Sequence, residues 1–403
     1  MRRYRPLGPS FTGRETTSRD APNQRGAASI RGTNVRVTCR RGGQNARVTR
    51  ARESALCVVG DRMGTGLLDV TEDLSALDSS GFWAVVVPYE GAPVCARFER
   101  VRPATPWPGA PWYGPTRDEW SSSLDQVQFC RGVETIRAAI AAGDVYQVNL
   151  TRRLSAPLPH HPPDGASTDI AALGAALAQG NPAPYAAVVR LPAHGVHVAS
   201  ASPELFVRRE GRRVWSSPIK GTATVASKLT PKDQAENVMI VDLVRNDLGR
   251  VCEWGSVEVP ALLRVEAHPG LVHLVSTVQG RLRDGVGWPE VIAATFPPGS
   301  VTGAPKIAAC SMIDALEATP RGVYCGAVGW VDADQQIGAL NVAIRTFFIE
   351  HGRLHFGTGG GITYDSDPRR EWEETELKAR RLLAVASRDT TVEPYPSGRR
   401  TSR

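Results

Sequence analysis

Several residue types and patterns are scarce in this chain of 403 residues, and their scarcity excludes whole classes of protein. The seven cysteines include no Cys-x-x-Cys pair and follow no regular spacing, which argues against a disulfide framework and against a zinc ribbon. No apolar run approaches the roughly 20 residues that a membrane span needs, and the first residues lack the apolar stretch of a secretory signal. We therefore expect a soluble, cytoplasmic protein with reduced thiols and no membrane partner.

Lysine is rare too, because only five of the 48 basic residues are lysines and the others are arginines. Twelve arginines lie within residues 1–50, where the only acidic residues are Glu15 and Asp20. Such a block can bind nucleic acid, but almost no aromatic residues interleave with it, so we expect no nucleic-acid partner. We interpret residues 1–34 as a disordered basic tail and residues 389–403 as a second disordered tail. The folded domain is then predicted to span 35–388.

Hydrophobic periodicity predicts a mixture of strands and helices. Short β-rich runs lie at 81–88, 185–191, 195–200, 323–331, 340–349 and 353–356, and helical periods lie at 131–142, 170–179, 233–246, 306–317 and 371–388. Short links that contain Gly or Asp join neighbouring strands, which favours antiparallel meanders over parallel βαβ units. The pattern therefore predicts a mixed α/β (α+β) fold with mainly antiparallel strands.

Two of the predicted helices begin with pairs of carboxylates. Asp233 and Glu236 lie three positions apart, as do Glu371 and Glu374, so each pair shares one helix face. Two such pairs could hold Mg²⁺, which prefers oxygen ligands and keeps several waters. Acidic residues also favour the first turn of any helix, and the sequence leaves this alternative open.

Two glycine-rich segments and one lysine complete the chemistry that is visible in the residues. Gly299 and Gly303 precede a predicted helix, and four glycines within 357–361 follow a strand, so both segments could bind an anion through backbone N–H groups. Neither matches a P-loop or a dinucleotide fingerprint, and both could be simple tight turns. Lys220 lies before Gly221 in an apolar segment, where it could act as a nucleophile or remain a solvated loop residue.

Together, these segments resemble the motifs of the chorismate-utilising enzymes, which include anthranilate synthase component I, aminodeoxychorismate synthase component I, isochorismate synthase and salicylate synthase. The matching segments lie within residues 130–388 and are, in chain order, GDVYQVNL (143–150), SASPELF (200–206), PIKGT (218–222), KDQAENVMIVDLVRNDLGRVCEWGSVEV (232–259), HLVSTVQGRL (273–282), FPPGSVTGAPK (296–306), YCGAVGW (324–330), IRT (344–346), GTGGGITYDSDP (357–368) and EWEETELKA (371–379). The resemblance implies two packed, mainly antiparallel sheets with helices outside and a substrate cleft between the sheets.

The third residue of the PIKGT segment separates the members of this family. Aminodeoxychorismate synthases typically carry lysine there, as Lys220 here, whereas anthranilate, isochorismate and salicylate synthases usually carry alanine. The resemblance implies that Lys220 attacks C2 of chorismate while the 4-hydroxyl leaves, and that ammonia then adds at C4 and expels the lysine. Glu204 corresponds to the family's general acid. Gln147 occupies the position at which isochorismate and salicylate synthases activate water with a lysine, so ammonia is the expected nucleophile.

The same resemblance implies a magnesium ion and a substrate pocket. Glu236 and Glu374 are the best metal ligands, with Asp233 and Glu371 close by or acting through water. Arg345 and the backbone of the triple glycine would hold the enolpyruvyl carboxylate. The full set of implied substrate-binding residues is Gly221, Thr222, His273, Ser300, Tyr324, Arg345, Gly359, Gly360, Gly361 and Lys378.

The implied activity is synthesis of 4-amino-4-deoxychorismate for p-aminobenzoate and folate biosynthesis. The sequence contains no glutaminase motif of the GxCxGxQ type, so ammonia would come from solution or from a separate glutamine amidotransferase subunit, component II. Anthranilate synthase component I is the main alternative, followed by isochorismate synthase and by a non-catalytic chorismate-binding subunit. No LLES-like segment is found, so we expect no feedback inhibition by tryptophan. The loop after PIKGT is short and lacks an arginine that many relatives carry.

Overall fold

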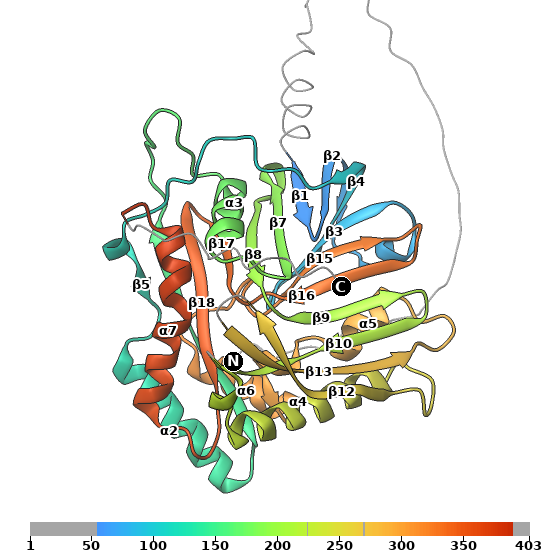
Figure 1. Cartoon of the computed structure of the whole chain (residues 1–403), viewed down its shortest axis with the longest axis vertical. Helices are drawn as coiled ribbons and strands as arrows, with labels where there is room; N and C mark the ends of the chain where they lie inside the picture. The colour runs from blue at the N-terminus through green and yellow to red at the C-terminus, as the bar shows by residue number, and fades with distance from the viewer. Residues whose placement is uncertain (1–54, 224, 269–270, 390–403) are drawn as a thin grey trace, which may run out of the picture. The chain divides into compact units, whose positions relative to one another are not determined.

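The computed structural model describes residues 55–223, 225–268 and 271–389, which all belong to one compact unit, Gln44–Arg403 (Figure 1). The predicted tail at residues 1–34, the predicted domain boundary at residue 35 and all but the first residue of the predicted tail at 389–403 lie outside the described residues. In the described part of the chain, no helix is both long enough and apolar enough to cross a membrane.

Eighteen strands form the framework of the described residues, and every pairing between them is antiparallel. The strands are β1 (Leu56–Val59), β2 (Arg62–Thr71), β3 (Phe82–Val87), β4 (Val94–Pro103), β5 (Ser121–Ser122), β6 (Gln147–Pro157), β7 (Tyr185–Leu191), β8 (Val196–Ser202), β9 (Leu205–Glu210), β10 (Arg213–Ser217), β11 (Ile219–Ala223), β12 (Glu258–His268), β13 (Leu271–Arg281), β14 (Gly303–Ala304), β15 (Ala327–Asp332), β16 (Ile337–Val342), β17 (Thr346–Glu350) and β18 (Arg353–Ile362).

Hydrogen-bonded neighbours follow one continuous path through this framework. The first half of the path runs β6–β18–β17–β8–β7–β1, and the hairpin from β1 to β2 leads into the second half. The second half runs β2–β4–β3–β15–β16–β9–β10–β13, and β13 pairs with β12 on its other edge. The two predicted sheets are therefore the two halves of one hydrogen-bonded array.

Six α-helices accompany the strands in the described residues. They are α2 (Gln126–Ala142), α3 (Ile170–Gly180), α4 (Pro231–Gly249), α5 (Trp288–Thr295), α6 (Lys306–Leu316) and α7 (Pro368–Ala386). Helix α7 packs against both α2 and α3, and these three helices lie against β6, β8 and β18, whereas α4 packs against β11, β12 and β13 (Figure 1). This arrangement confirms the predicted mixed α/β class with mainly antiparallel strands.

Apolar side chains from both halves of the array form the core. The largest cluster combines β3, β15 and β16 with α4 and α5, and includes Val85, Val328, Leu340 and Trp288. A second cluster joins α3 and α7 to β17 and β18, and a third joins α2 and α6 to β6. Because these clusters anchor α4 and α7 to the strands, they fix the directions in which both helices present their polar residues.

The structure departs from the sequence prediction at two places that matter for the site. The predicted single strand at 340–349 is two strands, because Arg345 has a left-handed φ of 51° and breaks the extended backbone between β16 and β17. The predicted strand at 353–356 continues through the glycine run as far as Ile362. Helix α5 is absent from the prediction, because its eight residues are too few for a clear helical period.

Candidate active site

Lys220 lies at an irregular point of strand β11. The pairing of β11 with β13 shifts register between Ile219 and Thr222, so the backbone carries a β-bulge at Lys220 and Gly221. Bulges re-aim side chains and are frequent beside active sites. The side chain of Lys220 is half-buried, and its Nζ donates a hydrogen bond of 3.1 Å to the carbonyl oxygen of Ser300.

Gly221 meets two requirements that only glycine satisfies. Its φ of +81° lies in the left-handed region. A Cβ at this position would also lie 2.8 Å from Cβ of Asp233, on helix α4. The glycine therefore lets β11 and α4 approach closely, which brings Lys220 beside the acidic end of that helix.

Glu204 is buried between strands β8 and β9, with 3% of its surface exposed. Its backbone is fixed on both sides, because its N–H donates to Ser202 Oγ at 3.2 Å and its carbonyl accepts from Val342 N at 3.0 Å. The carboxyl Oε1 accepts a hydrogen bond of 3.4 Å from the N–H of Ile219, the residue before Lys220. Burial raises the pKa of Glu204 to about 7, although Ser300 and the charge of Lys220 act in the opposite direction.

The glycine run on β18 forms a close-packed wall of the site. A Cβ on Gly361 would lie 2.0 Å from Gln147 Nε2 and 3.3 Å from Lys220 Nζ, so any side chain there would displace both residues. A Cβ on Gly360 would lie 3.1 Å from Glu371 Oε2. Strand β17 pairs with β18 only as far as Phe356, so among the described strands only β6 flanks the glycine run. The other edge of this run can therefore offer backbone groups to a ligand.

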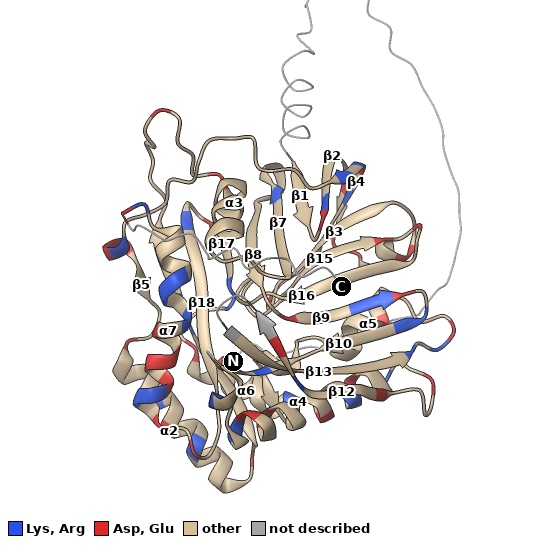
Figure 2. Cartoon of the chain, in the orientation of Figure 1, with Lys and Arg blue, Asp and Glu red and all other residues tan. Residues whose placement is uncertain are grey.

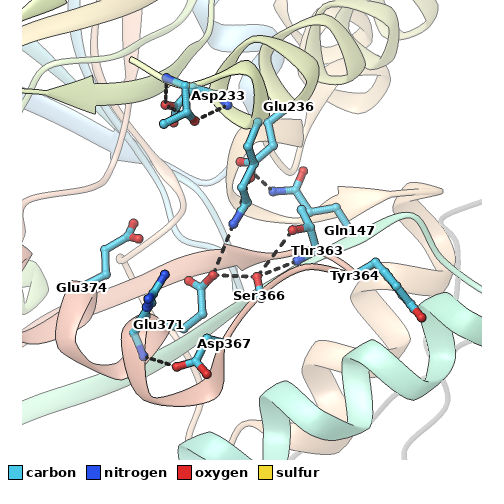
Figure 3. Close-up of polar contacts among 12 residues, drawn as sticks. Gln147, Asp233, Glu236, Thr363, Tyr364, Ser366, Asp367, Glu371 and Glu374 are labelled. Carbon is cyan, nitrogen blue, oxygen red and sulfur yellow. Dashed lines mark hydrogen bonds and ion pairs between the residues drawn. The ribbon is translucent and has the colours of Figure 1, made fainter. Parts of the chain in front are cut away.

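Two of the four predicted metal ligands, Glu236 and Glu371, are linked through one lysine, Lys232, and Figure 3 shows both of them with their polar contacts. Lys232 Nζ lies 3.7 Å from Glu236 Oε1 on α4 and 3.5 Å from Glu371 Oε1 on α7. Glu371 also accepts a 2.5 Å hydrogen bond from Ser366, and Glu236 accepts one of 3.4 Å from Gln147 Nε2. Burial raises the pKa of Glu236 despite the positive charges nearby.

Glu374 lies one turn after Glu371 on α7 and has a different lysine partner. It forms an ion pair of 2.7 Å with Lys378, and this ammonium lowers the pKa of Glu374. Lys378 Nζ also donates a hydrogen bond of 2.9 Å to the carbonyl of Gly359, which ties α7 to the glycine run. Figure 2 shows the acidic and basic segments that alternate along this helix.

Asp233 takes a different part in the structure from the three glutamates. It is the third residue of α4, and its Oδ2 accepts hydrogen bonds of 2.7 Å from both N and Oγ1 of Thr230. The two residues thus form a capping box at the helix start. Figure 3 shows Asp233 apart from Glu371 and Glu374. The capping box gives Asp233 a structural partner in the first turn of α4, and its part at the metal site stays a prediction.

The remaining predicted residues lie on several elements of the fold. Arg345 is half-buried and close enough to act electrostatically on Glu204. Tyr324 is buried, and the absence of a side chain at Gly357 makes room for its ring. His273 is buried on β13, where it pairs across the strands with Thr222. Ser300 occupies a single 3₁₀ turn, Gly299–Val301, that follows helix α5.

Sequence reasoning missed Lys232 and Ser366, the residues that hold Glu371 and Glu236 in place. The signal for Lys232 was present, because it precedes Glu236 by four positions and such pairs meet on one helix face. Ser366 gave no comparable signal, because its contact with Glu371 depends on the turn that leads into α7. Among the described residues, no group of three or more His, Cys, Asp or Glu side chains is gathered closely enough to hold a metal ion.

A sequence profile of chorismate binding enzymes matches residues 106–384. The chain belongs to this family. Anthranilate synthase component 1 1 of Haloarcula marismortui is 41% identical over 278 residues, which cover 66% of this chain and 54% of the relative. Aminodeoxychorismate synthase component 1 of Bacillus subtilis is 36% identical over 292 residues, which cover 69% of this chain and 60% of the relative. The aminodeoxychorismate synthase of Streptomyces pristinaespiralis is 43% identical over 267 residues, which cover 63% of this chain and 36% of the relative. The chain thus spans 36–60% of the lengths of these relatives.

Solved structures of the family share this fold. Anthranilate synthase component I from Streptococcus pneumoniae superposes with a TM-score of 0.65 at 26% identity, covering 77% of this chain and 84% of that one. The menaquinone-specific isochorismate synthase of Escherichia coli superposes with a TM-score of 0.67 at 18% identity, and the superposition covers 83% of this chain and 89% of that one. The second likeness shows the fold alone. Family membership therefore agrees with the resemblance drawn from the motifs.

Proposed function

We propose that this chain converts chorismate and ammonia into 4-amino-4-deoxychorismate, for p-aminobenzoate and folate biosynthesis. The observation that carries the proposal is the placement of Lys220: it lies on a β-bulge, beside the residue that hydrogen-bonds Glu204 and against the glycine wall. An amine in this position can attack a substrate whose leaving group faces Glu204. The family alone does not select this product, because its members include both anthranilate and aminodeoxychorismate synthases.

The proposed chemistry proceeds in two displacements. Unprotonated Lys220 Nζ forms a bond to C2 of chorismate, both ring double bonds shift by one position, and the C4 hydroxyl leaves as water with the proton of Glu204. Ammonia then adds at C4, both double bonds shift back, and the C2–N bond breaks, which returns Lys220 as a neutral amine. Covalent catalysis of this kind divides one difficult step into two easier ones. Burial suits Glu204 to its part, because a pKa of about 7 keeps a fraction of the carboxyl protonated near neutral pH.

We propose that the carboxylates of α4 and α7 bind a divalent cation that displaces the Lys232 ammonium. Two observations support this proposal: the ammonium lies within 3.7 Å of both Glu236 and Glu371, and the buried Gln147 Oε1 has no hydrogen-bond partner among the described residues. Glu236, Glu371 and Glu374 would hold Mg²⁺, with Asp233 close by or acting through water. When bound, the ion would neutralise the ring carboxylate of chorismate and draw electron density from C2.

Binding of the enolpyruvyl carboxylate is proposed for Arg345 and the free edge of the glycine run. Arginine suits this task because its guanidinium can bind a carboxylate through two parallel hydrogen bonds. Gly221, Thr222, His273, Ser300, Tyr324 and Lys378 would line the rest of the pocket. Ammonia would be supplied by solution or by a glutamine amidotransferase subunit, because component I in the relatives' names implies a second component.

Product analysis by mass spectrometry tests this proposal. The full chain is incubated with chorismate, Mg²⁺ and an ammonium salt, with and without an added aminodeoxychorismate lyase. We expect 4-amino-4-deoxychorismate, and p-aminobenzoate only when the lyase is present. In the Lys220→Ala variant, we expect both products to fall to a small fraction of the wild-type amount. Wild-type rates in that variant would remove the covalent mechanism.

Anthranilate synthesis is the second candidate, and the 41% identity to the Haloarcula anthranilate synthase component favours it. It predicts anthranilate and pyruvate as the products of the same incubation. Lys220 opposes this candidate, because the anthranilate synthases usually carry alanine at that position. Detection of anthranilate would replace the proposed product and leave the family assignment unchanged.

A further inference from the structure

A cavity of about 20 Å³ lies beside Glu204, enclosed by β9, β10, helix α4 and the segment that carries Ser300. Its lining includes the polar residues Glu204, Ser216, Asp247, Thr295 and Ser300. The described residues that line this cavity include neither Lys220 nor any of the carboxylates proposed to bind Mg²⁺. The cavity is therefore separate from the proposed metal site. A polar cavity needs at least about 10–15 Å³ to hold one water molecule.

The hydroxyl of Ser300 is the second observation at this site. Ser300 Oγ is buried and makes no hydrogen bond to any described residue. It lies near enough to Glu204 to lower the pKa of that carboxyl, but not in hydrogen-bonding geometry with it. A buried hydroxyl without a partner costs free energy unless a water satisfies it.

The cavity lining includes Asp247, whose ion pair with Lys306 the proposed reaction does not use. Asp247 Oδ2 accepts a hydrogen bond of 2.7 Å from Lys306 Nζ. The same Nζ donates a second hydrogen bond of 2.9 Å to the carbonyl oxygen of Thr295. Both charged side chains are largely buried, with 6% of Asp247 and 17% of Lys306 exposed. These residues come from the RND and GAPK parts of the sequence motifs.

We propose that one water occupies this cavity, accepts a hydrogen bond from Ser300 Oγ and donates to Glu204 and to Asp247. Three such bonds are the usual number for a buried water. Asp247 is then a positioning residue, because it orients the water and the water sets the proton affinity of Glu204. The inference rests on the proposed role of Glu204 as the proton donor of the reaction.

Several charged groups surround Glu204, and their effects on its pKa have known directions. The positive charges of Lys220 on β11 and of Arg345 between β16 and β17 both lower the pKa of Glu204, whereas burial raises this pKa. On the cavity side, we expect the negative charge of Asp247 to raise the pKa of Glu204 and its ion pair with Lys306 on α6 to reduce that effect. A water that donates to the carboxylate lowers it further, so removing the water should raise the pKa of Glu204.

Filling the cavity from an apolar wall tests the inference without altering a charge. Val244 on α4 lines the cavity, and Val244→Ile adds one methyl group. Val241 is buried one turn earlier on the same helix and does not line the cavity, so Val241→Ile is the matched control. Glu204 is titrated in the full chain by the infrared band of its protonated carboxyl, assigned by its loss in Glu204→Gln.

We expect Val244→Ile to raise the pKa of Glu204 by about one unit, the effect of losing one hydrogen bond to a carboxylate, and Val241→Ile to leave it unchanged. We expect Asp247→Asn to lower the pKa of Glu204, because that change removes a nearby negative charge. A Val244→Ile shift no larger than that of Val241→Ile would overturn the inference. Because the titration needs no turnover, it separates this inference from the identity of the product.

A crystal structure provides the direct readout and covers the case in which a variant loses stability. We expect density for one water within hydrogen-bond distance of Ser300 Oγ in the wild-type chain and no such density in Val244→Ile. A dry cavity in a well-ordered wild-type structure would overturn the inference, whatever the titration shows.

Discussion

Replacing Lys232 should change the affinity of the protein for Mg²⁺ before any substrate is present. Its ammonium lies 3.7 Å from Glu236 and 3.5 Å from Glu371, so it neutralises the carboxylates proposed to bind the metal. A cation that binds these carboxylates must first displace the ammonium. Lys232→Gln removes this competitor and keeps a side chain of similar length.

The size of the effect follows from the two ion pairs. Coulomb's law at an effective dielectric of about 20 gives roughly 4–5 kcal/mol for each pair at these distances. Because 43% of the Lys232 side chain is exposed, solvent screening reduces each pair to about 0.5–1 kcal/mol. The sum of about 1–2 kcal/mol corresponds to an affinity for Mg²⁺ that is roughly tenfold higher in Lys232→Gln.

Isothermal titration calorimetry of the metal-free full chain with Mg²⁺, at fixed ionic strength and without chorismate, measures this affinity. Lys228→Gln is the matched control, because Lys228 is exposed just before helix α4 and its removal lowers the net charge equally. Lys232→Arg keeps the positive charge, so its affinity for Mg²⁺ should stay below that of Lys232→Gln. Equal or weaker binding of Mg²⁺ in Lys232→Gln would refute the reasoning and would make Lys232 a support for the carboxylates.

Four further predictions concern single carboxylates. Glu236→Gln and Glu374→Gln should each abolish Mg²⁺ dependence and most turnover of chorismate; an unchanged magnesium titration in both would contradict the metal assignment. Asp233→Ala should lower the free energy of unfolding in urea by about 1 kcal/mol through loss of the capping box, with a smaller effect on Mg²⁺ affinity than Glu236→Gln. Because burial raises the pKa of Glu204 from its usual 4.5 to about 7, kcat/KM should fall as pH rises through about 7. For the same reason the folded state loses stability between about pH 4.5 and pH 7, so Glu204→Gln should unfold at a higher temperature than the wild type at pH 8.

Local sequence signals predicted the helices well where caps and periodicity agree. Helix α2 begins at a capping box of Asp125 and Gln128 and ends at Gly143 in the left-handed conformation. The sequence-based range for this helix began five residues late, because its first turn has a weak apolar period. Helix α5 was missed altogether, since its eight residues lie between two longer patterns.

The composition of the site was visible in the motifs, but its geometry was not. Glu204 and Lys220 meet because β9 leads through β10 into β11, and the bulge that aims Lys220 depends on the pairing with β13. No local pattern specifies that register. Likewise, Asp233 and Glu236 share a helix face in the sequence, yet Thr230 holds Asp233 for capping while Glu236 turns toward Gln147. Side-chain partners of this kind are decided by tertiary contacts.

The distribution of lysine gives these contacts a common physical basis. Arginine supplies nearly all the positive charge of this chain, yet four of its five lysines lie at the proposed site or at the cavity beside it. They are Lys220, Lys232, Lys306 and Lys378.

Each of these positions needs a property that arginine lacks. A nucleophile must lose its proton, which an arginine side chain does not do in proteins. The ammonium groups of Lys232 and Lys378 are compact, and each contacts two acceptors that lie in different directions. A planar guanidinium has its donors at fixed angles and is less suited to such a pair of contacts. Lys220→Arg should therefore be as inactive as Lys220→Ala despite its retained charge, and activity in the arginine variant would show that charge alone is what the site requires.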